Sequence, residues 1–289
     1  RQGMSLRVDE MLASHRTRRS VIVGILNVTP DSFSDGGSFL DPADASAQAE
    51  RLVADGAQAI DIGAESTRPG SRRIGPDEQI RRLREVLPAV CRLGVPVSID
   101  TTRAEVAEFA LDAGAEIVND VSAGRDDPEL LPLVARRGAA VVLMHMLGTP
   151  KTMQEDPHYE DVVAEVRAFL AERIAAAEDA GVPRERVVID PGIGFGKRLT
   201  HNLLLLRHID ALCALGPPVL VGPSRKRFIG EITGEAEPRR RVAGTVAACL
   251  AARRGGASVF RVHDVKELAE SLAVDAAIAT AGDVAKTPT

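Results

Sequence analysis

The chain contains no tryptophan, and aromatic residues make up only 3 % of its 289 residues. Apolar residues still account for 45 % of the sequence, which is enough to bury a large core in one or two domains. Alanine, valine, leucine and isoleucine must fill that core. This composition is typical of helices packed against a parallel sheet.

Cysteine is scarce as well. The three cysteines, Cys91, Cys213 and Cys249, lie far apart, and none belongs to a CxxC pair or a Cys/His cluster. Their spacing argues against a disulfide framework and against a structural zinc site. We interpret them as buried reduced thiols, which are typical of a cytoplasmic protein.

Long hydrophobic runs and basic stripes are also missing. No stretch approaches about 18 consecutive apolar residues, and no apolar targeting segment precedes the first predicted strand, so we expect neither a membrane span nor export. The 36 basic and 41 acidic residues are interspersed and leave a net charge of −5, which argues against binding to nucleic acid. The basic run at residues 16–20 is interpreted as a solvated terminus.

The common catalytic signatures are absent too. The sequence has no GxSxG, Walker loop or HExxH motif, and no convincing Ser–His–Asp set. A reaction catalysed by this chain must therefore depend on positioning and electrostatics more than on a protein nucleophile.

The sequence does contain a regular alternation of short β-rich runs and longer amphipathic segments, such as residues 43–56, 103–116 and 162–181. Strand and helix alternating eight times predict an α/β fold, the (β/α)₈ or TIM barrel. An open doubly wound sheet is the alternative, but no GxGxxG follows the first run. The predicted strands are Val21–Leu26, Ala59–Ile62, Val97–Ile99, Ile117–Val118, Ala140–Met144, Val187–Ile189, Val219–Val221 and Val259–Val262.

We expect one barrel domain over residues 20–281, with an N-terminal extension at 1–19 and a C-terminal tail at 282–289. Two Asp–Pro pairs, Asp41–Pro42 and Asp127–Pro128, predict helix starts in which the aspartate caps the helix and the proline takes its first position.

Every predicted strand ends in a polar or charged residue. The carboxyl ends of barrel strands meet at one mouth, where barrel enzymes build their active sites. These ends therefore predict a single small-molecule site. The residues are Asn27, Asp61, Asp100, Asn119, Asp120, His145, Asp190, the Gly222–Lys226 segment, Arg261 and His263.

Asp100, Asn119 and Asp190 suit recognition of a heterocycle. A carboxylate accepts two parallel N–H bonds, and a carboxamide both donates and accepts, as the edge of a 2-amino-4-oxo-pyrimidine requires. The glycines that follow Asp190 allow the backbone to approach a flat ligand closely. Two alternatives stay open: Asp100 could be a helix cap, and Asn119 or Asp120 could serve only to hold a loop.

The last two strands are followed by basic residues. Lys226, in a Gly-Pro-Ser-Arg-Lys turn, could donate to a ring carbonyl, although such a basic triplet could also be a solvated turn. Arg261 and His263 stand at alternate positions and so on one face, which indicates a clamp for an oxyanion or phosphate. A histidine satisfied within the core is the alternative for His263.

Eight segments, in order, resemble the signatures of the dihydropteroate synthases, a family of folate-pathway enzymes. The resemblance extends from about Ser20 to Ala279. It implies a barrel enzyme that joins 6-hydroxymethyl-7,8-dihydropterin diphosphate to 4-aminobenzoate and releases 7,8-dihydropteroate and pyrophosphate. The segments are GILNVTPDSFSDGG, ESTRPG, SIDTTR, NDVSAG, HMLGTPKTMQ, DPGIGFGK, GPSRKRFIG and RVHDV.

The resemblance also implies roles for individual residues. Asn27 is expected to coordinate Mg²⁺, and Arg261 and His263 to hold the pyrophosphate together with Asn27, Thr67 and Arg68. Two mobile loops are expected to close over the aminobenzoate. From charge and position alone, and not from the resemblance, we expect Asp31 or Asp35 of the first loop to face a developing pterin cation. The loop residues are Phe33, Thr67, Arg68 and Pro69. The residues expected around the pterin are Asp100, Asn119, Met144, Asp190, Gly194, Phe195 and Lys226.

One position departs from part of the family. Some members carry serine directly after the motif lysine, where it helps to bind the aminobenzoate carboxylate, and this chain has Arg227. Either Arg227 binds the carboxylate, or helix amides bind it and Arg227 faces solvent.

Two other functions share some of these features. The methyltetrahydrofolate:corrinoid methyltransferases look similar at Asp100, Asn119 and Asp190, and a catalytically inactive regulatory paralogue would keep the fold. The resemblance further implies a homodimer, formed through the helices after the last three strands, and competition by sulfonamides with 4-aminobenzoate.

Overall fold

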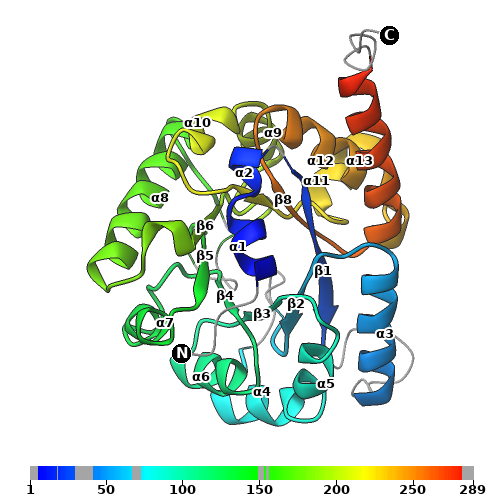
Figure 1. Cartoon of the computed structure of the whole chain (residues 1–289). Helices are drawn as coiled ribbons and strands as arrows, with labels where there is room; N and C mark the ends of the chain where they lie inside the picture. The colour runs from blue at the N-terminus through cyan, green and yellow to red at the C-terminus, as the bar shows by residue number, and fades with distance from the viewer. Residues whose placement is uncertain are drawn as a thin grey trace, which may run out of the picture.

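The structure is a computed structural model that describes residues 6–17, 19–29, 42–66, 73–148, 153 and 156–281. Its eight strands are all parallel and run in the order β6-β5-β4-β3-β2-β1-β8-β7. A bridge between Ile189 and Val219 joins the first and last strands of this order and closes the barrel (Figure 1). The strands are β1 Val21–Asn27, β2 Ala59–Gly63, β3 Val97–Asp100, β4 Ile117–Asp120, β5 Ala140–Met144, β6 Val187–Asp190, β7 Leu220–Val221 and β8 Val259–Val262.

The predicted (β/α)₈ barrel is therefore confirmed, and every predicted strand matches the observed one to within two residues at each end. Almost every strand residue is buried, including all of β2 and β5. A parallel strand is covered by side chains on one face and by helices on the other, which is why it appears in the sequence as a continuous apolar run.

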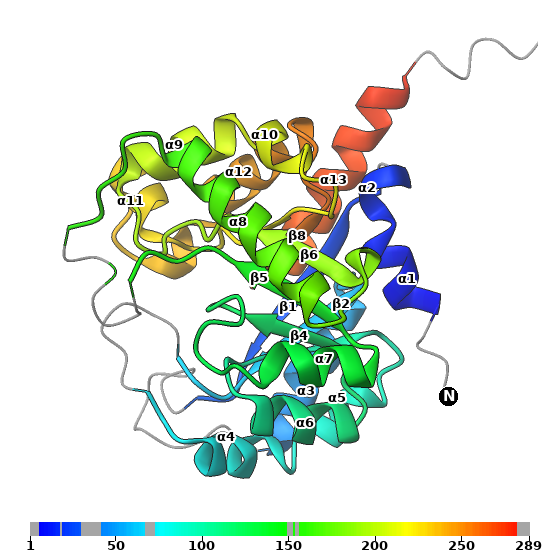
Figure 2. The ribbon, with the colours of Figure 1, turned by 90° about the vertical axis from the view of Figure 1, so that its left-hand side faces the viewer.

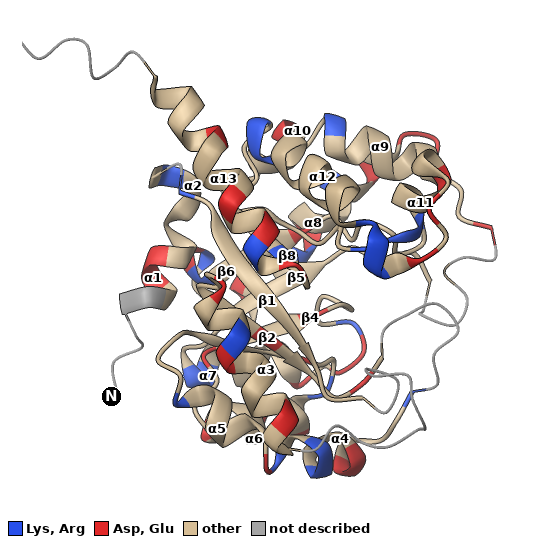
Figure 3. Ribbon diagram, turned by 90° about the vertical axis from the view of Figure 1, so that its right-hand side faces the viewer, with Lys and Arg blue, Asp and Glu red and all other residues tan. Residues whose placement is uncertain are grey.

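Helices cover the outside of the barrel on all sides (Figure 1). Positive and negative residues are interspersed over the helices visible in Figure 3. No helix in the described part of the chain is long and apolar enough to cross a membrane. The outer helices are α3 Pro42–Ala54, α4 Pro76–Leu83, α5 Leu87–Cys91, α6 Ala104–Asp112, α7 Leu130–Arg137, α8 Val162–Asp179, α9 Leu199–Arg207, α10 Asp210–Cys213, α11 Arg227–Thr233, α12 Val242–Arg254 and α13 Val265–Thr280, with short 3₁₀ turns at Arg184–Arg186 and Pro238–Arg240.

The main core lies between the sheet and these helices. Its members are mostly alanine, valine, leucine and isoleucine, as the composition predicts, with Phe228, Phe260 and Tyr159 as its buried aromatics. All three cysteines are free, but only Cys249 is fully buried, whereas Cys91 and Cys213 are half-buried. The prediction of buried thiols is thus right for one cysteine and partly right for two.

The segment predicted as an N-terminal extension completes the barrel. Helices α1, Leu6–Leu12, and α2, Ser14–Thr17, lie at one end of the barrel, and α11 lies at the other (Figure 2). Val8, Met11 and Leu12 are at most 6 % exposed. They pack against inward-facing side chains from seven of the strands, which are Val21, Val23, Ala59, Ile117, Ala140, Val142, Val188, Leu220 and Val259.

Candidate active site

The strand register brings the predicted site residues together at the C-terminal mouth. Asp100 on β3 is paired with Asn119 on β4, and Met144 on β5 with Asp190 on β6. The side chains of Asp100, Asn119 and Asp190 are each less than 10 % exposed. Three polar side chains buried side by side at one mouth need a partner, whether a ligand or a neighbouring residue.

Arg261 lies at the centre of this group. Its Nε donates to Asp61 Oδ2 at 2.6 Å, and its Nη2 donates to Asp100 Oδ2 at 3.2 Å. Asn119 Nδ2 also donates to Asp61 Oδ2, at 3.1 Å. One guanidinium therefore connects carboxylates from β2 and β3, and the amide of β4 joins the same network.

Burial shifts the pKa values of these groups. Burial and, to a smaller extent, the charge of Asp61 raise the pKa of Asp100 from 3.8 to about 7, although the charge of Arg261 opposes the rise. Burial opposes the charge of Arg261, but the carboxylates of Asp61 and Asp100 outweigh this effect and raise its pKa. Arg261 therefore stays charged, and the carboxyl of Asp100 titrates near neutral pH. Shifts of this kind are typical of functional sites.

Asp61 was predicted only as a polar residue at a strand end, without a role of its own. It is 2 % exposed, and among the described residues its Oδ1 has no hydrogen-bond partner. Its position within the apolar strand AIDIG was the available signal, because a carboxylate is rarely buried there unless it is paired. The structure makes Asp61 the residue that orients Arg261.

Asp190 and Lys226 face each other across the glycine-containing loop after β6. Asp190 Oδ1 accepts the Gly192 N–H at 2.7 Å, and Lys226 Nζ donates to the carbonyl of Ile193. Burial raises the pKa of Asp190, while the charge of Lys226 opposes that rise. Burial lowers the pKa of Lys226 to about 8, and the carboxylate of Asp190 opposes that change.

An apolar platform lies beside these charges. Met144 packs with Met146, Met153, Val121 and Phe195. The ring of Phe195 also lies under Lys226, whose Nζ is 4.5 Å from the ring centroid. Gly194 belongs to the same loop, and a Cβ added there would come within 3.0 Å of Lys226 Cδ. The predicted pterin residues on β5, on the β6 loop and in the β7 turn are thus brought together.

His263 is held by the turn after β7. Its Nδ1 lies 2.9 Å from Ser224 Oγ, and its backbone N–H donates to the same hydroxyl at 3.1 Å. Ser224 belongs to the strand-end segment predicted for the site, and its two contacts fix where the imidazole sits. His263 is half-buried at the mouth, directly after β8.

The three basic residues of the turn after β7, Arg225, Lys226 and Arg227, have different surroundings. Arg225 has a left-handed backbone, with φ +60°, and binds both carboxylate oxygens of Asp264 at 3.0 and 2.5 Å. Arg227 is 86 % exposed and pairs with Glu231 at 2.7 Å on the outside of α11. A solvated turn is therefore wrong for Arg225 and Lys226, and only Arg227 faces solvent.

Two alternatives for the acidic residues are now decided. Asp120 holds its own loop: Oδ1 accepts the N–H and the hydroxyl of Ser122, both at 2.7 Å, and Oδ2 accepts the Gly124 N–H at 2.5 Å. Asn119, in contrast, contacts Asp61. Asp120 is thus the loop residue and Asn119 the site residue.

Asp100 does not cap a helix. Asp127 Oδ2 accepts the N–H of Ala104, the first residue of α6, at 2.8 Å. The prediction for the Asp127–Pro128 pair is partly right: Asp127 Oδ1 accepts the Glu129 N–H at 3.1 Å just before α7, but α7 begins only at Leu130, so Pro128 is not its first residue. The side chain of Asp100 therefore belongs to the polar group at the mouth of the barrel.

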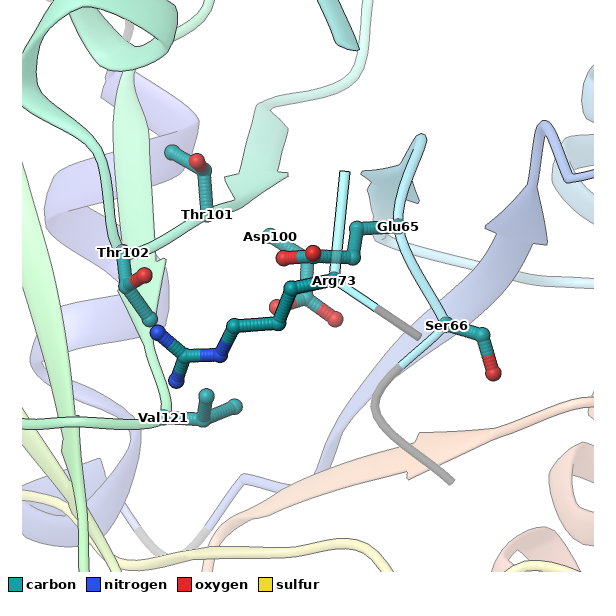
Figure 4. Close-up of a pocket in the computed structure, with 7 residues that line it drawn as sticks. All are labelled: Glu65, Ser66, Arg73, Asp100, Thr101, Thr102 and Val121. Carbon is teal, nitrogen blue, oxygen red and sulfur yellow. The ribbon is translucent and has the colours of Figure 1, made fainter. Parts of the chain in front are cut away.

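Asp100 also lines a pocket between the ends of β2, β3 and β4 (Figure 4). Figure 4 shows Arg73 extending toward Thr102 and Val121 at this pocket. Glu65 accepts the Ile74 N–H at 2.8 Å, and burial raises the pKa of Glu65. The lining residues are Glu65, Ser66, Arg73, Asp100, Thr101, Thr102 and Val121.

Several predicted site residues cannot be placed. Phe33, Asp35, Thr67, Arg68 and Pro69 lie outside the described residues, as does Asp31. Asn27 is described: it is the half-buried last residue of β1 and is paired in register with Gly63. Within the described ranges, no group of three or more His, Cys, Asp or Glu residues could hold a metal ion.

A barrel whose mouth buries three carboxylates beside a half-buried arginine and a half-buried lysine defines an enzyme site for a small polar ligand. A family model described as a pterin binding enzyme matches residues 23–263. The chain therefore belongs to the pterin binding enzymes, as the eight sequence segments predict.

The relatives define the family more narrowly. A dihydropteroate synthase of Synechocystis sp. is 47 % identical over 254 residues, which cover 88 % of each chain. The Xanthomonas albilineans dihydropteroate synthase with 4-aminobenzoic acid is 48 % identical, with a TM-score of 0.84 over 93 % of this chain and 94 % of that one. The Thermus thermophilus enzyme in complex with 6HMPPP is 48 % identical, with a TM-score of 0.79 over 90 % and 94 %. The chain stands among the dihydropteroate synthases, which are transferases.

Proposed function

We propose that this chain joins 6-hydroxymethyl-7,8-dihydropterin diphosphate to 4-aminobenzoate and releases 7,8-dihydropteroate and pyrophosphate. The observation that carries this proposal is the burial of Asp100, Asn119 and Asp190 beside Lys226 at one barrel mouth. Relatives with nearly half of the sequence in common have been solved with 4-aminobenzoic acid and with 6HMPPP, which supports the same substrate pair here.

The pterin ring is bound by hydrogen bonds along its edge. Asp100 and Asp190 accept ring N–H groups, and Asn119 both donates and accepts. Lys226 donates to the ring carbonyl; with a pKa lowered to about 8 it is mostly protonated at pH 7. A ligand without this edge leaves buried polar groups unpaired, so the site discriminates steeply against it.

Met144 and Phe195 complete the pterin site. Both belong to the apolar platform at the ends of β5 and β6, where a flat ring can pack against a methionine side chain and an aromatic ring. Gly194 keeps the space above this loop open, because a side chain there would press against Lys226.

The diphosphate is the leaving group. The bond between the pterin methylene carbon and the diphosphate oxygen breaks, and its electron pair departs with the diphosphate. Arg261 binds this group together with His263 and Asn27. Its contacts with Asp61 and Asp100 use Nε and Nη2 and leave Nη1 as a donor for the diphosphate.

The residues present fit Mg²⁺ carried by the diphosphate. Mg²⁺ usually keeps several waters and binds through one or two protein oxygens together with substrate phosphates. The side-chain oxygen of Asn27, at the end of β1, is a donor of this kind, and we assign it to the ion. When bound, Mg²⁺ neutralises part of the diphosphate charge.

The second substrate needs little activation. The aniline nitrogen of 4-aminobenzoate is neutral at pH 7, so it forms the new carbon–nitrogen bond without a general base and then loses a proton to solvent. This explains why the sequence carries no nucleophile or triad.

The residues that bind 4-aminobenzoate stay predictions. Arg227 would have to leave Glu231 to bind the carboxylate, and its role stays a prediction. So do the roles of Phe33, Asp35, Thr67, Arg68 and Pro69, and competition by sulfonamides.

A pyrophosphate assay tests the function. The purified protein, both substrates and Mg²⁺ should give pyrophosphate and dihydropteroate in equal amounts, and pyrophosphate release should depend on 4-aminobenzoate. A corrinoid methyltransferase or an inactive paralogue would release none. Either absence of release or release independent of 4-aminobenzoate would overturn the proposal.

We also propose that the chain forms a homodimer through α12 and α13. On α13, Val274 and Ile278 are 60 % and 69 % exposed, and they line a groove with Leu250 of α12. Large exposed apolar side chains gathered in one groove are typical of protein interfaces.

Sedimentation equilibrium tests the dimer. It should give the mass of two chains, and Ile278→Lys should reduce this mass to that of one chain. A wild-type mass of one chain at micromolar concentration would contradict this assignment. The cytoplasmic location stays a prediction.

A further inference from the structure

A buried lysine behind the pterin loop has no part in the chemistry above. Lys197 is the last residue of the DPGIGFGK segment and is only 3 % exposed. Its Nζ lies 2.9 Å from the carbonyl oxygen of Phe195, 2.9 Å from His145 Nδ1 and 3.4 Å from the carbonyl oxygen of His145. Three acceptors match the three N–H donors of an ammonium group.

This arrangement is costly, which indicates that it serves a purpose. Lysine is almost never fully buried unless it is paired, and these three partners carry no negative charge. Burial lowers the pKa of Lys197 well below its usual value, opposed by the charge of Asp190. An apolar side chain of the same length would fill the space without that cost.

His145, directly after β5, is held as a neutral acceptor. An ammonium group can only donate, so when Lys197 is protonated Nδ1 of His145 carries the lone pair and Nε2 the proton. Burial lowers the pKa of His145 to about 2, and the charges of Lys197 and Arg125 act in the same direction. Its ring is fixed edge-on against Phe169, with a centroid separation of 4.8 Å.

The loop that Lys197 holds lies directly on the end of β5. Gly192 has φ +67°, and a Cβ added there would stand 1.9 Å from the carbonyl oxygen of His145. No residue other than glycine fits at this contact. Two further side chains hold the back of the loop: Asn202 Oδ1 accepts the Gly194 N–H at 2.7 Å, and the Tyr159 hydroxyl donates to the Gly196 carbonyl at 2.8 Å.

The front of the same loop carries the pterin contacts. The carbonyl of Ile193 accepts from Lys226, and the ring of Phe195 lies under the Lys226 ammonium. The backbone carbonyl of Phe195 faces the opposite way, toward Lys197. A shift of this carbonyl would therefore move both the aromatic ring and the lysine that reads the pterin.

We propose that Lys197, with His145 as its acceptor, is a positioning residue that fixes the β6 loop in the form that binds the pterin. Lys197 touches neither substrate in this proposal, and it acts through Phe195 and the Ile193 carbonyl. The inference rests on the proposed function, because it assigns the pterin to this loop.

The test compares Lys197→Met, which keeps the length but removes the donors, with Lys266→Met at an exposed lysine of α13. We expect Lys197→Met to raise the pterin-diphosphate KM about tenfold, less than the ~10²-fold that a 1 Å misplacement can cost. The aminobenzoate KM and kcat should change less than about twofold. Lys266→Met should match the wild type. His145→Leu, which removes only one acceptor, should give the same selective effect in a weaker form.

A double-mutant cycle separates positioning from mere packing. In a Phe195→Ala background, Lys197→Met should add less than about twofold to the pterin KM, because residues acting through one element are not additive. Equal losses for both substrates, or a lower melting temperature with an unchanged pterin KM, would overturn the proposal. Should Lys197→Met not fold, the His145→Leu result decides by the same criteria. Failure of the proposed function itself is distinguishable, since the wild type would then release no pyrophosphate.

Discussion

The two ends of the barrel bury side chains of opposite kinds. At the N-terminal end, Val8, Met11 and Leu12 of α1 fill the opening with apolar groups. At the C-terminal mouth, Asp61 and Asp100 are buried beside Arg261. Burial of apolar area stabilises the first end, at roughly 25 cal/mol per Å². Burial of charge at the C-terminal mouth lowers the free energy of unfolding, and the shifted pKa values are the sign of this cost.

The sign of that effect follows from the direction of each shift. The pKa of Asp100 is raised from 3.8 to about 7, so its stabilising contribution is fully present below about pH 4 and is lost as the pH rises through 7. At working pH the ionised carboxylate therefore costs folding free energy. The mouth is prepared for a ligand at the expense of stability, whereas α1 contributes stability without touching a ligand.

The largest expected effect is on activity, and it comes from the mouth. Lys226→Met should lower kcat/KM by about 10²–10³-fold, because truncating one partner of a hydrogen-bonded charge pair costs about 2–5 kcal/mol. The melting temperature should not fall, because the substitution removes a charge whose pKa burial lowers to about 8. The rate of pyrophosphate release checks the predicted loss of activity, and calorimetry checks the predicted melting temperature. If the variant loses activity only because it unfolds, Lys226 contributes to stability and the two ends of the barrel do not differ as described.

A substitution at the N-terminal end of the barrel should lower stability and leave activity unchanged. Met11→Ala should lower the free energy of unfolding by about 2 kcal/mol, because it leaves a cavity among the strand side chains. Activity at 25 °C should be unchanged. Glu10→Ala, an exposed position on the same helix, is the matched control and should change neither quantity. Urea unfolding gives the free energies, and a loss of kcat in Met11→Ala would show that the ends are not independent.

The smallest expected effect is the pH dependence of pterin binding, which tests the charge of Asp100 at the mouth. Only ionised Asp100 accepts the ring N–H groups, and with a pKa of about 7 it is mostly protonated at pH 6. Binding of a pterin that does not titrate in this range should be about tenfold weaker at pH 6 than at pH 8. Titration calorimetry checks this. Asp100→Asn should bind weakly and equally at both pH values. Equal wild-type affinities would mean that Asp100 is not the titrating acceptor.

Much of the molecule could be predicted because its signals are local. Continuous apolar runs mark parallel strands, and their ends carry Asn27, Asp100, Asn119, Asp190, Arg261 and His263. The barrel topology alone brings those ends to one mouth. The local signal at Asp127 was incomplete, because its second carboxylate oxygen also accepts the N–H of Ala104 in a helix that lies earlier in the chain.

The rest depends on contacts between residues far apart in the sequence. Asp61 and Arg261 are separated by 200 residues, and Lys197 and His145 by 52. No periodicity or spacing predicts which carboxylate an arginine will choose or which carbonyl a buried lysine will bind. The sequence by itself determined the barrel, the family and the polar mouth, because strand order and strand ends are written along the chain. Only the tertiary structure decided that α1 closes the other end, that Asp61 orients Arg261, and that Lys197 contacts His145 and Phe195, because these follow from side-chain packing in three dimensions.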